Sequence, residues 1–550
     1  MVEERRYPIG LQNFSDIITG RGIYIDKTEY VYKMVSSITK YFFLSRPRRF
    51  GKSLLVSTLE AYFLGRKDLF EGLAINKKEK EWTEYPVIHL DMSGGRYHDF
   101  NIARANIDSV LKEYEKKWNI NVEEECIYFF GNRLKTIIQT ANEKTNRKIV
   151  VLIDEYDLPM LDTIDKPELQ GRIRNCIRDL FSPLKSQEKL LRFVFLTGIS
   201  QFSQLSVFSE LNNLYNITFD ENYEACCGIT EEELNAQMKP DIEKLQRCLQ
   251  IKYPDITYED ILTKLKKMYD GYHFSKKMTD IYNPWSLLNT FQRCDFQSFW
   301  FETGTSSSLI NLLKQLNLNQ LDLNDFETDI SRFNAPIEQN RDPVPVLFQS
   351  GYLSLKNYYP QSERYKLGFP NEEVRVGFAN SLVRYYFPNN NGPSRTMSQA
   401  YKELCVGSRP IEYFLEELRI FYSAIPCSVI NKNERHYQSI LYAVLTTVGA
   451  DVEVEKETAI GRMDLVMKIP NAIYIIEFKY DKDALSALQQ IKDRFYAVAF
   501  AQDRRSVFGI GLNISSTRRT IDENGYMIEE LPTTLPSTPE TWTRADPITL

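Results

Sequence analysis

The sequence has few residues of the kinds that build disulfide-linked or metal-clustered proteins. Its 550 residues include only 8 cysteines and 4 histidines, and no two cysteines stand in a CxxC spacing. This argues against a zinc ribbon, a disulfide framework and a histidine metal site. Scattered cysteines, with one adjacent pair at Cys226 and Cys227, indicate reduced thiols in a cytoplasmic protein.

Long apolar runs are also missing. No run approaches the roughly 20 residues that cross a bilayer, and residues 1–10 are charged and lack the apolar segment of a signal peptide. We therefore expect no membrane partner. The sequence also lacks a large net charge. It contains 68 Lys and Arg residues and 74 Asp and Glu residues, so the net charge is −6. That balance argues against a protein that coats nucleic acid, although a local basic groove remains compatible with it.

What the chain does contain is a regular alternation of patterns. Its length predicts two to four domains. Short apolar runs at 41–44, 87–90, 149–153 and 192–196 predict strands, and helical patterns between them favour an α/β fold with a parallel sheet. From about 229 to 319 the pattern is mostly helical and opens with a capping sequence, Thr230-Glu231-Glu232-Glu233.

A phosphate-binding loop is indicated at RPRRFGKS, residues 46–53. Gly51, Lys52 and Ser53 match the end of the G-x-x-x-x-G-K-[ST] pattern, but Arg46 occupies its first glycine position. The loop follows an apolar run and opens a helix, where backbone N–H groups attract phosphate. We expect Lys52 to reach the β- and γ-phosphates of ATP and Ser53 to ligate Mg²⁺. Taken alone, Gly-Lys-Ser is also an ordinary helix start.

The sequence VVLIDEYD, residues 150–157, provides the second half of such a site. We expect Asp154 to organise Mg²⁺ at the strand end and Glu155 to orient the attacking water. The alternative is a strand that ends in a solvated acidic loop. Four further positions are predicted to contact the nucleotide: Arg48, Arg49, Phe50 and Thr197. Thr197 also fits an ordinary turn, and the two arginines also fit a subunit contact or neutralisation of nearby carboxylates.

These segments resemble a bacterial AAA-ATPase-like family. The resemblance covers roughly residues 6–310 and includes YPIGLQNFSDIITGRGIYIDKTEYV, LTGISQFSQLSVFSELNNL, GITEEEL, DGYHF and YNPWSLL. The loop of that family resembles RPRRFGK[ST], so Arg46 is its ordinary form. The resemblance implies an AAA-type P-loop core followed by a helical lid, with ATP and Mg²⁺ as cofactors. AAA-type ATPases often form rings, which implies a homo-oligomer, but no trans-acting arginine can be assigned.

Near the other end, GRMDLVMKIPNAIYIIEFKY, residues 461–480, predicts two strands joined by a Pro-Asn turn. Asp464 lies on the first strand, and Glu477 and Lys479 stand two apart on the second, so they share a face. Two carboxylates with a backbone carbonyl suit Mg²⁺ or Mn²⁺, and a lysine there stabilises charge on a phosphodiester. Glu434 and Gln490, on the preceding and following helices, are predicted to complete the site. The alternative is a surface hairpin of mixed charge.

This part resembles the PD-(D/E)XK nuclease superfamily over roughly residues 425–515. The family pattern GR-x-D, E-F-K, Q-I and Tyr corresponds here to Gly461, Arg462, Asp464, Glu477, Lys479, Gln490 and Tyr496. The resemblance implies an α/β/α restriction-endonuclease-like domain with a metal-dependent nuclease site. It also implies nucleic acid as the partner, with DNA favoured over RNA.

Together these features predict five segments in an α/β protein. They are a P-loop core at 1–225, a helical lid at 226–320, a mixed connecting region at 321–410, the nuclease-like domain at 411–525 and a Pro/Thr-rich tail at 526–550. The leading hypothesis is an ATPase whose nucleotide state controls cleavage, with a role in mobile-element or phage defence by analogy. Two alternatives stay open: an NTPase switch that binds nucleic acid without cutting it, and a scaffold that uses ATP as a structural ligand.

Overall fold

The computed structural model describes residues 5–164, 166–201, 214–304, 323, 326–337, 342–386, 395–425, 433–458 and 461–534. The chain forms two compact units. The first comprises residues 1–317 and 325–374, and the second comprises 318–324 and 375–550. The SQLSVFSELNN part of the family resemblance, the end of the predicted lid at 305–320 and most of the predicted tail lie outside the described residues.

The first unit contains a five-stranded parallel sheet in the order β2-β3-β4-β1-β5. Its strands are β1 (Tyr41–Ser45), β2 (Val87–Asp91), β3 (Ile149–Asp154), β4 (Leu191–Gly198) and β5 (Tyr215–Asn216). The four strands expected from the apolar runs are confirmed, and the two-residue edge strand β5 is additional. Strands β3 and β4 lie inside the sheet and are buried almost throughout, which explains their continuous apolar sequences.

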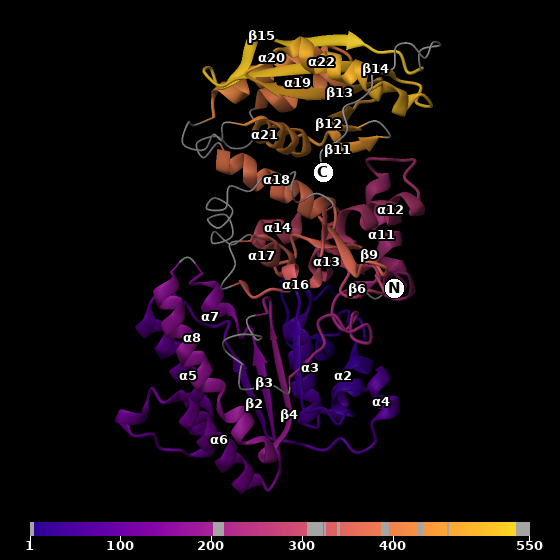
Figure 1. Ribbon diagram of the computed structural model, residues 1–550. Helices are drawn as coiled ribbons and strands as arrows, with labels where there is room; N and C mark the ends of the chain where they lie inside the picture. Colours follow the sequence, from indigo (N-terminus) through magenta and orange to yellow (C-terminus); the bar gives the residue numbers. More distant parts are fainter. Residues whose placement is uncertain are drawn as a thin grey trace. The chain divides into compact units, whose positions relative to one another are not determined.

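Helices cover both faces of this sheet (Figure 1). One layer contains α1 (Phe14–Thr19), α2 (Thr28–Val35), α3 (Lys52–Phe63) and α4 (Ala74–Lys78). The other contains α5 (Phe100–Trp118), α6 (Phe130–Thr145) and α8 (Pro167–Phe181), with short helices α7 (Leu158–Leu161) and α9 (Pro183–Ser186) between elements. This three-layer arrangement places the start of α3 and the end of β3 at the same edge of the sheet, where ligands bind in open α/β folds.

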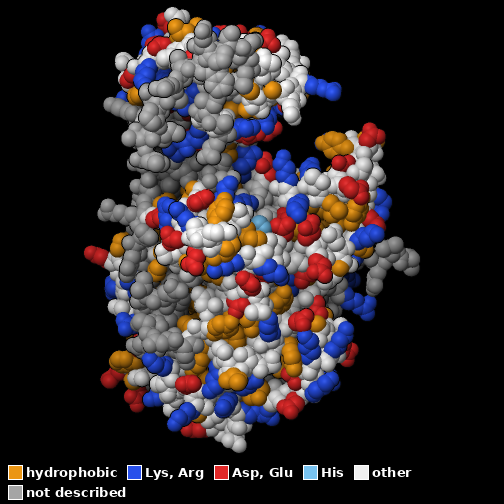
Figure 2. Space-filling view, turned by 45° about the vertical axis from the view of Figure 1, so that its right-hand side comes forward, with side chains coloured by type: hydrophobic (Ala, Val, Ile, Leu, Met, Phe, Trp, Pro, Cys, Tyr) orange, Lys and Arg blue, Asp and Glu red, His pale blue; other side chains and the backbone are white. Residues whose placement is uncertain are grey.

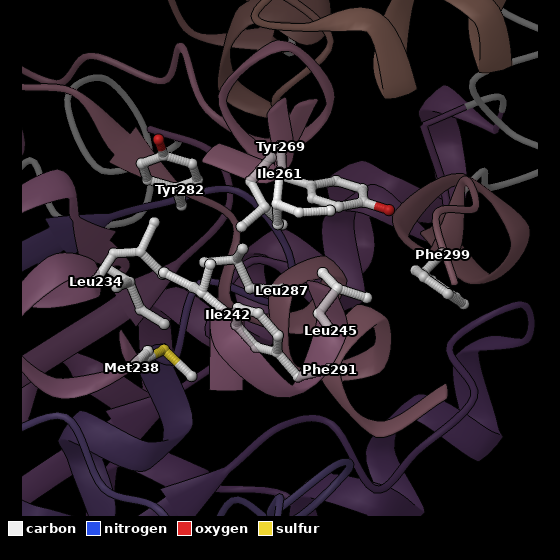
Figure 3. Close-up of a cluster of buried hydrophobic side chains, with 12 residues drawn as sticks. Leu234, Met238, Ile242, Leu245, Ile261, Tyr269, Tyr282, Leu287, Phe291 and Phe299 are labelled. Carbon is white, nitrogen blue, oxygen red and sulfur yellow. The ribbon is translucent and has the colours of Figure 1, made fainter. Parts of the chain in front are cut away.

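The helical lid follows the sheet. It contains β6 (Ile229–Thr230), α10 (Glu231–Gln237), α11 (Lys239–Gln250), α12 (Tyr258–Tyr269), β7 (Ile281–Tyr282), α13 (Pro284–Arg293) and α14 (Phe299–Gly304). The predicted capping start is confirmed, because Thr230 and Glu233 form a capping box at the start of α10. Figure 3 shows the lid core, in which Ile242 and Leu245 of α11 gather with Leu287 and Phe291 of α13.

The segment expected to connect two domains is divided between the two units instead. Its first part contains β8 (Phe326–Thr328), α16 (Ile330–Phe333), α17 (Val344–Gln349), β9 (Ser354–Tyr359) and β10 (Arg364–Gly368), with sheet order β8-β10-β9. This part packs on the lid, because the backbone N–H of His273 donates to the Ser354 hydroxyl at 2.9 Å and its imidazole lies 2.7 Å from the Leu355 carbonyl. Helix α18 (Glu372–Tyr386) crosses the division at residue 374.

The second unit is a five-stranded sheet flanked by helices. Its elements are α19 (Arg395–Cys405), α20 (Ile411–Ser423), α21 (Glu434–Thr447), β11 (Asp451–Thr458), β12 (Gly461–Lys468), β13 (Ala472–Tyr480), α22 (Ala484–Asp493), β14 (Ser506–Ser515) and β15 (Thr520–Glu530). The sheet order is β11-β12-β13-β14-β15, and only the β13–β14 pair is parallel. The predicted hairpin is therefore the β12–β13 pair.

Helix α22 ends at Asp493, shortly before Phe495, which has a left-handed φ of 46°. One predicted boundary in this unit needs correction. Strand β15 continues to Glu530, beyond the predicted start of the tail at residue 526, because its backbone pairs with β14.

Surface charge agrees with the composition. On the face shown in Figure 2, Lys and Arg side chains are interspersed with Asp, Glu and scattered hydrophobic ones. Within the described ranges, no helix combines the length and apolar character needed to span a membrane.

The lid contains a buried carboxylate whose ionisation should affect its stability. Asp270, at the end of α12, is 2% exposed, and burial raises its pKa from 3.8 to about 7 although Lys266 lies 4.0 Å away. The folded lid retains this proton between the two pKa values, whereas the unfolded chain releases it. The contribution of protonated Asp270 to the free energy of unfolding is therefore fully present below pH 3.8. It is lost as the pH rises toward 7.

We expect Asp270→Asn to slow hydrogen exchange in α12 relative to wild type at pH 8 and to leave it unchanged at pH 4, once both rates are corrected for intrinsic exchange. The difference in local stability should reach at most about 4 kcal/mol. Asp255→Asn, in the loop that precedes α12, is the control. Asp260→Asn is not used because Asp260 belongs to the capping box of this helix. If the variant and wild type are equally protected from exchange at pH 8, ionisation of buried Asp270 does not destabilise the lid.

Candidate active sites

The predicted phosphate loop lies between β1 and α3 in the first unit. Gly51 has a φ of 94°, a conformation that glycine adopts without strain, and helix α3 begins at the next residue. Lys52 is buried, and its Nζ lies 3.2 Å from Oε1 of Glu155. The Ser53 hydroxyl forms a hydrogen bond with the Asp154 carboxylate. The structure thus brings together four residues that the sequence predicted for one site.

Negative charge accumulates beside this loop. Burial and the neighbouring Glu155 carboxylate raise the pKa of Asp154 to about 6, against the lowering effects of Ser53 and Lys52. Asp157 is fully buried, and its pKa is also raised to about 6 by burial and by Glu155. A hydroxyl and a carboxylate with excess negative charge fit Mg²⁺, which keeps several waters and needs few protein ligands. Such an ion neutralises phosphate charge when bound.

Arg46, in the position of the missing glycine, is a buried structural residue. Its guanidinium donates hydrogen bonds to four backbone carbonyls: Ser45 at 2.9 Å, Thr218 at 2.8 Å, Tyr223 at 3.3 Å and Glu224 at 3.2 Å. The side chain is 1% exposed. Arg46 therefore ties the loop to the segment that follows β5 and does not face phosphate.

The next loop residues contact the lid. Phe50 packs edge-on against Tyr272 and Phe274, with ring centroids 4.7 and 5.5 Å apart, and its carbonyl accepts a hydrogen bond from Gly228 at 3.0 Å. The guanidinium of Arg49 lies 3.7 Å from the ring centroid of Trp285. These contacts show that the predicted nucleotide-binding residues Phe50 and Arg49 also join the loop to the DGYHF and YNPW segments.

Two other residues that were predicted to contact the nucleotide, Thr197 and Arg48, form hydrogen bonds within the protein. The hydroxyl of Thr197 is fully buried and donates to the Leu44 carbonyl of β1 at 2.8 Å. This hydrogen bond lies between the paired strands β1 and β4. The Arg48 carbonyl accepts a hydrogen bond from the Trp300 indole at 3.2 Å, and the Arg48 charge lowers the pKa of Asp162, which burial raises overall. Their roles toward nucleotide stay predictions.

A cavity of about 380 Å³, here called the loop cavity, adjoins the phosphate loop. Its lining includes residues 49–55 of the loop, Glu155 and apolar residues from the N-terminal segment and the lid. Polar phosphate-side residues next to apolar walls are the arrangement that a nucleotide requires. Sequence reasoning missed part of this lining: Lys27, Cys226, Cys227 and Trp285. Their only sequence signal was their position within or beside the family segments.

In the second unit, the three predicted nuclease residues meet on β12 and β13. The backbone N–H of Asp464 donates to Oε1 of Glu477 at 3.2 Å, and the N–H of Phe478 donates to the Asp464 carboxylate at 2.9 Å. Glu477 is 0% exposed. Burial and the Asp464 charge raise the pKa of Glu477 to about 9.

Gln490 of α22 links this pair to the lysine. Its amide nitrogen donates to Oε2 of Glu477 at 2.7 Å, and its amide oxygen accepts from Nζ of Lys479 at 2.7 Å. The Tyr496 hydroxyl donates to the Arg462 carbonyl at 2.7 Å. The buried carboxylate pair, which does not ionise fully by itself, fits a divalent cation with water as further ligand.

Glu434 stands at the first position of α21, as predicted. Burial raises its pKa, while the charges of Lys479 and Lys482 lower it and that of Asp464 raises it. These effects place Glu434 within electrostatic range of the Asp464 site. No group of three or more His, Cys, Asp or Glu side chains has metal-binding geometry among the residues that the structure describes.

The comparisons with known proteins agree with this geometry. Residues 8–208 match the AAA-ATPase-like family, described as a predicted AAA-ATPase, and residues 432–524 match the PD-(D/E)XK nuclease superfamily. A curated relative, the uncharacterized protein of the vnfD 5′ region of Azotobacter chroococcum mcd 1, is 31% identical over 541 residues, which cover 96% of this chain and 100% of the relative. No solved structure matches this chain.

The buried role of Arg46 leads to a prediction against the general P-loop pattern. Arg46→Gly restores the usual first glycine but leaves four carbonyls without their charged donor. We expect the free energy of unfolding of the first unit to fall by at least about 3 kcal/mol, as measured by urea unfolding. Arg48→Gly, two residues away, controls for backbone flexibility and should cost less than about 1 kcal/mol. An Arg46→Gly variant of wild-type stability would rule out this anchoring role.

Proposed function

Because this chain belongs to the AAA-ATPase-like family and carries a C-terminal PD-(D/E)XK nuclease superfamily domain, we propose that it hydrolyses ATP and uses its nucleotide state to control metal-dependent cleavage of nucleic acid. The observation that carries this proposal is that the central predicted residues of each site lie together. Lys52, Glu155, Ser53 and Asp154 meet at one sheet edge, and Asp464, Glu477, Gln490 and Lys479 form one hydrogen-bonded network.

Hydrolysis, beyond binding, is supported by Glu155. Its backbone has a left-handed φ of 48°, which is uncommon for a residue with a side chain, and its carboxylate reaches the P-loop lysine. A protein that only held ATP as a structural ligand would not need a carboxylate there. When nucleotide occupies the loop cavity, Lys52 would turn from Glu155 to phosphate and leave Glu155 to orient water.

Cleavage is supported by how the second unit holds its lysine. Gln490 keeps Nζ of Lys479 beside the carboxylate pair, where a positive charge stabilises the charge that develops on a phosphodiester. We favour DNA over RNA as substrate. Mobile-element or phage defence is the biological setting that we propose by analogy with other ATPase–nuclease fusions.

One observation favours the alternative of a switch that binds nucleic acid without cutting it. Both oxygens of Glu477 already accept hydrogen bonds, and the side chain is fully buried, so a metal would have to share these oxygens with their existing partners. An Asp464→Asn substitution separates the two. Under the switch interpretation, wild type and variant bind nucleic acid equally and neither cuts it.

The first test is cleavage of labelled single- and double-stranded DNA and RNA by the full-length protein with Mg²⁺ or Mn²⁺. We expect Lys479→Ala to reduce cleavage at least about 100-fold, because it removes charge stabilisation at the phosphodiester, while ATP binding persists. Lys492→Ala is the matched control, since Lys492 is exposed on the same helix as Gln490 and pairs with Glu529. Equal cleavage by wild type and Lys479→Ala would refute the nuclease assignment of this site.

The second test addresses control by nucleotide. We expect ATP to change the wild-type cleavage rate at least about fivefold, and Lys52→Ala to abolish both ATP binding and this change. Lys67→Ala, an exposed lysine shortly after α3, should behave as wild type. A cleavage rate that is the same with and without ATP in wild type, and the same again in Lys52→Ala, would show that the two sites act independently.

A further inference from the structure

Two adjacent cysteines lie in the wall of the loop cavity. Cys226 and Cys227 are 1% and 3% exposed, and both line the cavity together with Lys27 and Lys52. Neither has a role in the phosphate chemistry proposed above. They are joined by a trans peptide bond, and their side chains interact with each other.

Two cations lie close enough to Cys226 to act on its sulfur. The buried guanidinium of Arg46 is held beside this segment by the carbonyls of Tyr223 and Glu224, and Lys27, which lines the same cavity, forms an ion pair with Glu233. The hydrogen bond with Cys227, opposed by burial and aided by these cations, lowers the pKa of Cys226 to about 7. The same hydrogen bond raises the pKa of Cys227. A thiolate beside a thiol is the arrangement of a reactive dithiol.

We propose that Cys226 and Cys227 form a peroxide-reactive dithiol whose oxidation to a disulfide prevents nucleotide binding. The Cys226 thiolate attacks one oxygen of hydrogen peroxide, which forms an S–O bond, breaks the O–O bond and releases hydroxide that is protonated to water. Cys227 then gives up its proton and attacks the sulfenic sulfur, which forms the S–S bond and releases a second water. Two thiols are oxidised and one peroxide is reduced.

The backbone around the pair explains why oxidation would affect nucleotide. Cα atoms of consecutive residues are about 3.8 Å apart across a trans peptide, below the range of about 4.4–6.8 Å that disulfides prefer. The backbone must therefore change to close the ring. The next residue, Gly228, donates to the Phe50 carbonyl, and a Cβ built on it would lie 2.3 Å from Ile281 and 3.4 Å from Phe50. With so little space, a shift at Cys227 displaces Phe50 and the phosphate loop.

Reversibility follows from the same strain. A disulfide held outside its preferred geometry is readily reduced, so thiols should restore the binding-competent form. The chain offers a matched comparison in the lid, where Cys294 also forms a hydrogen bond with a neighbouring thiol, Cys248. That pair does not line the loop cavity, and burial raises the pKa of Cys294 to about 11.

The test uses the reduced full-length protein and a methylanthraniloyl derivative of ATP as the fluorescent probe. This proposal rests on the nucleotide-binding role of the loop cavity, so the Kd of the reduced protein is measured first. After hydrogen peroxide, we expect the Kd to rise at least about tenfold, to recover with dithiothreitol, and the peptide containing residues 226–227 to lose two hydrogens by mass. In Cys226→Ser, the ratio of Kd after to before peroxide should be near 1, whereas Cys294→Ser should keep the wild-type ratio.

The outcomes separate the two proposals. Failure of the reduced protein to bind the probe contradicts the proposed ATPase function, and the mass measurement then decides on the dithiol alone. Normal binding that peroxide leaves unchanged, or an equal loss in Cys226→Ser, overturns the redox proposal and leaves the ATPase function intact. A mass change at Cys248 and Cys294 in place of Cys226 and Cys227 overturns it as well.

Discussion

The buried guanidinium of Arg46 is the interaction on which the first unit depends. A general P-loop begins with glycine because the backbone must turn closely around phosphate. Here the Arg46 side chain donates hydrogen bonds to four backbone carbonyls, two of which belong to residues 223 and 224. Its guanidinium also lies 4.1 Å from the ring centroid of Phe274 in the lid. One cation therefore holds the loop, the segment after β5 and the lid together, and its removal exposes several polar groups at once.

The lid is coupled to the loop by aromatic packing rather than by a free hinge. Phe50 lies against Tyr272 and Phe274, and between these two residues His273 contacts β9. A continuous set of contacts thus runs from the phosphate loop through the lid to the small antiparallel sheet. Because packed interiors have few voids, a change at the loop is transmitted as a shift of these rings. This gives the first unit a physical route by which nucleotide could change its shape.

The sequence predicted what depends on local pattern and missed what depends on distant partners. Apolar runs identified β1 to β4, and GKS, DEYD and the 461–480 hairpin identified residues that the structure brings together. The role of Arg46 was not visible, since three of its carbonyl partners lie 172 to 178 positions away. Residues 326–374 have no strong periodicity, and their place beside the lid rests on contacts such as His273 with Leu355. The polar sequence of β15 concealed a strand stabilised by its partner β14.

The two sites share one electrostatic design, and this limits how they can be coupled. Each joins a buried carboxylate with a raised pKa, Asp154 or Glu477, to a second acid and one lysine, and a divalent cation would favour the ionised form of both carboxylates. In an ATPase site, the phosphates of the nucleotide are themselves ligands, so metal and ATP enter together. Glu477 and Asp464 need no nucleotide to hold a cation. Under the proposed function, ATP therefore cannot control cleavage by supplying the metal. The control must then act through the protein, by a change that begins in the first unit.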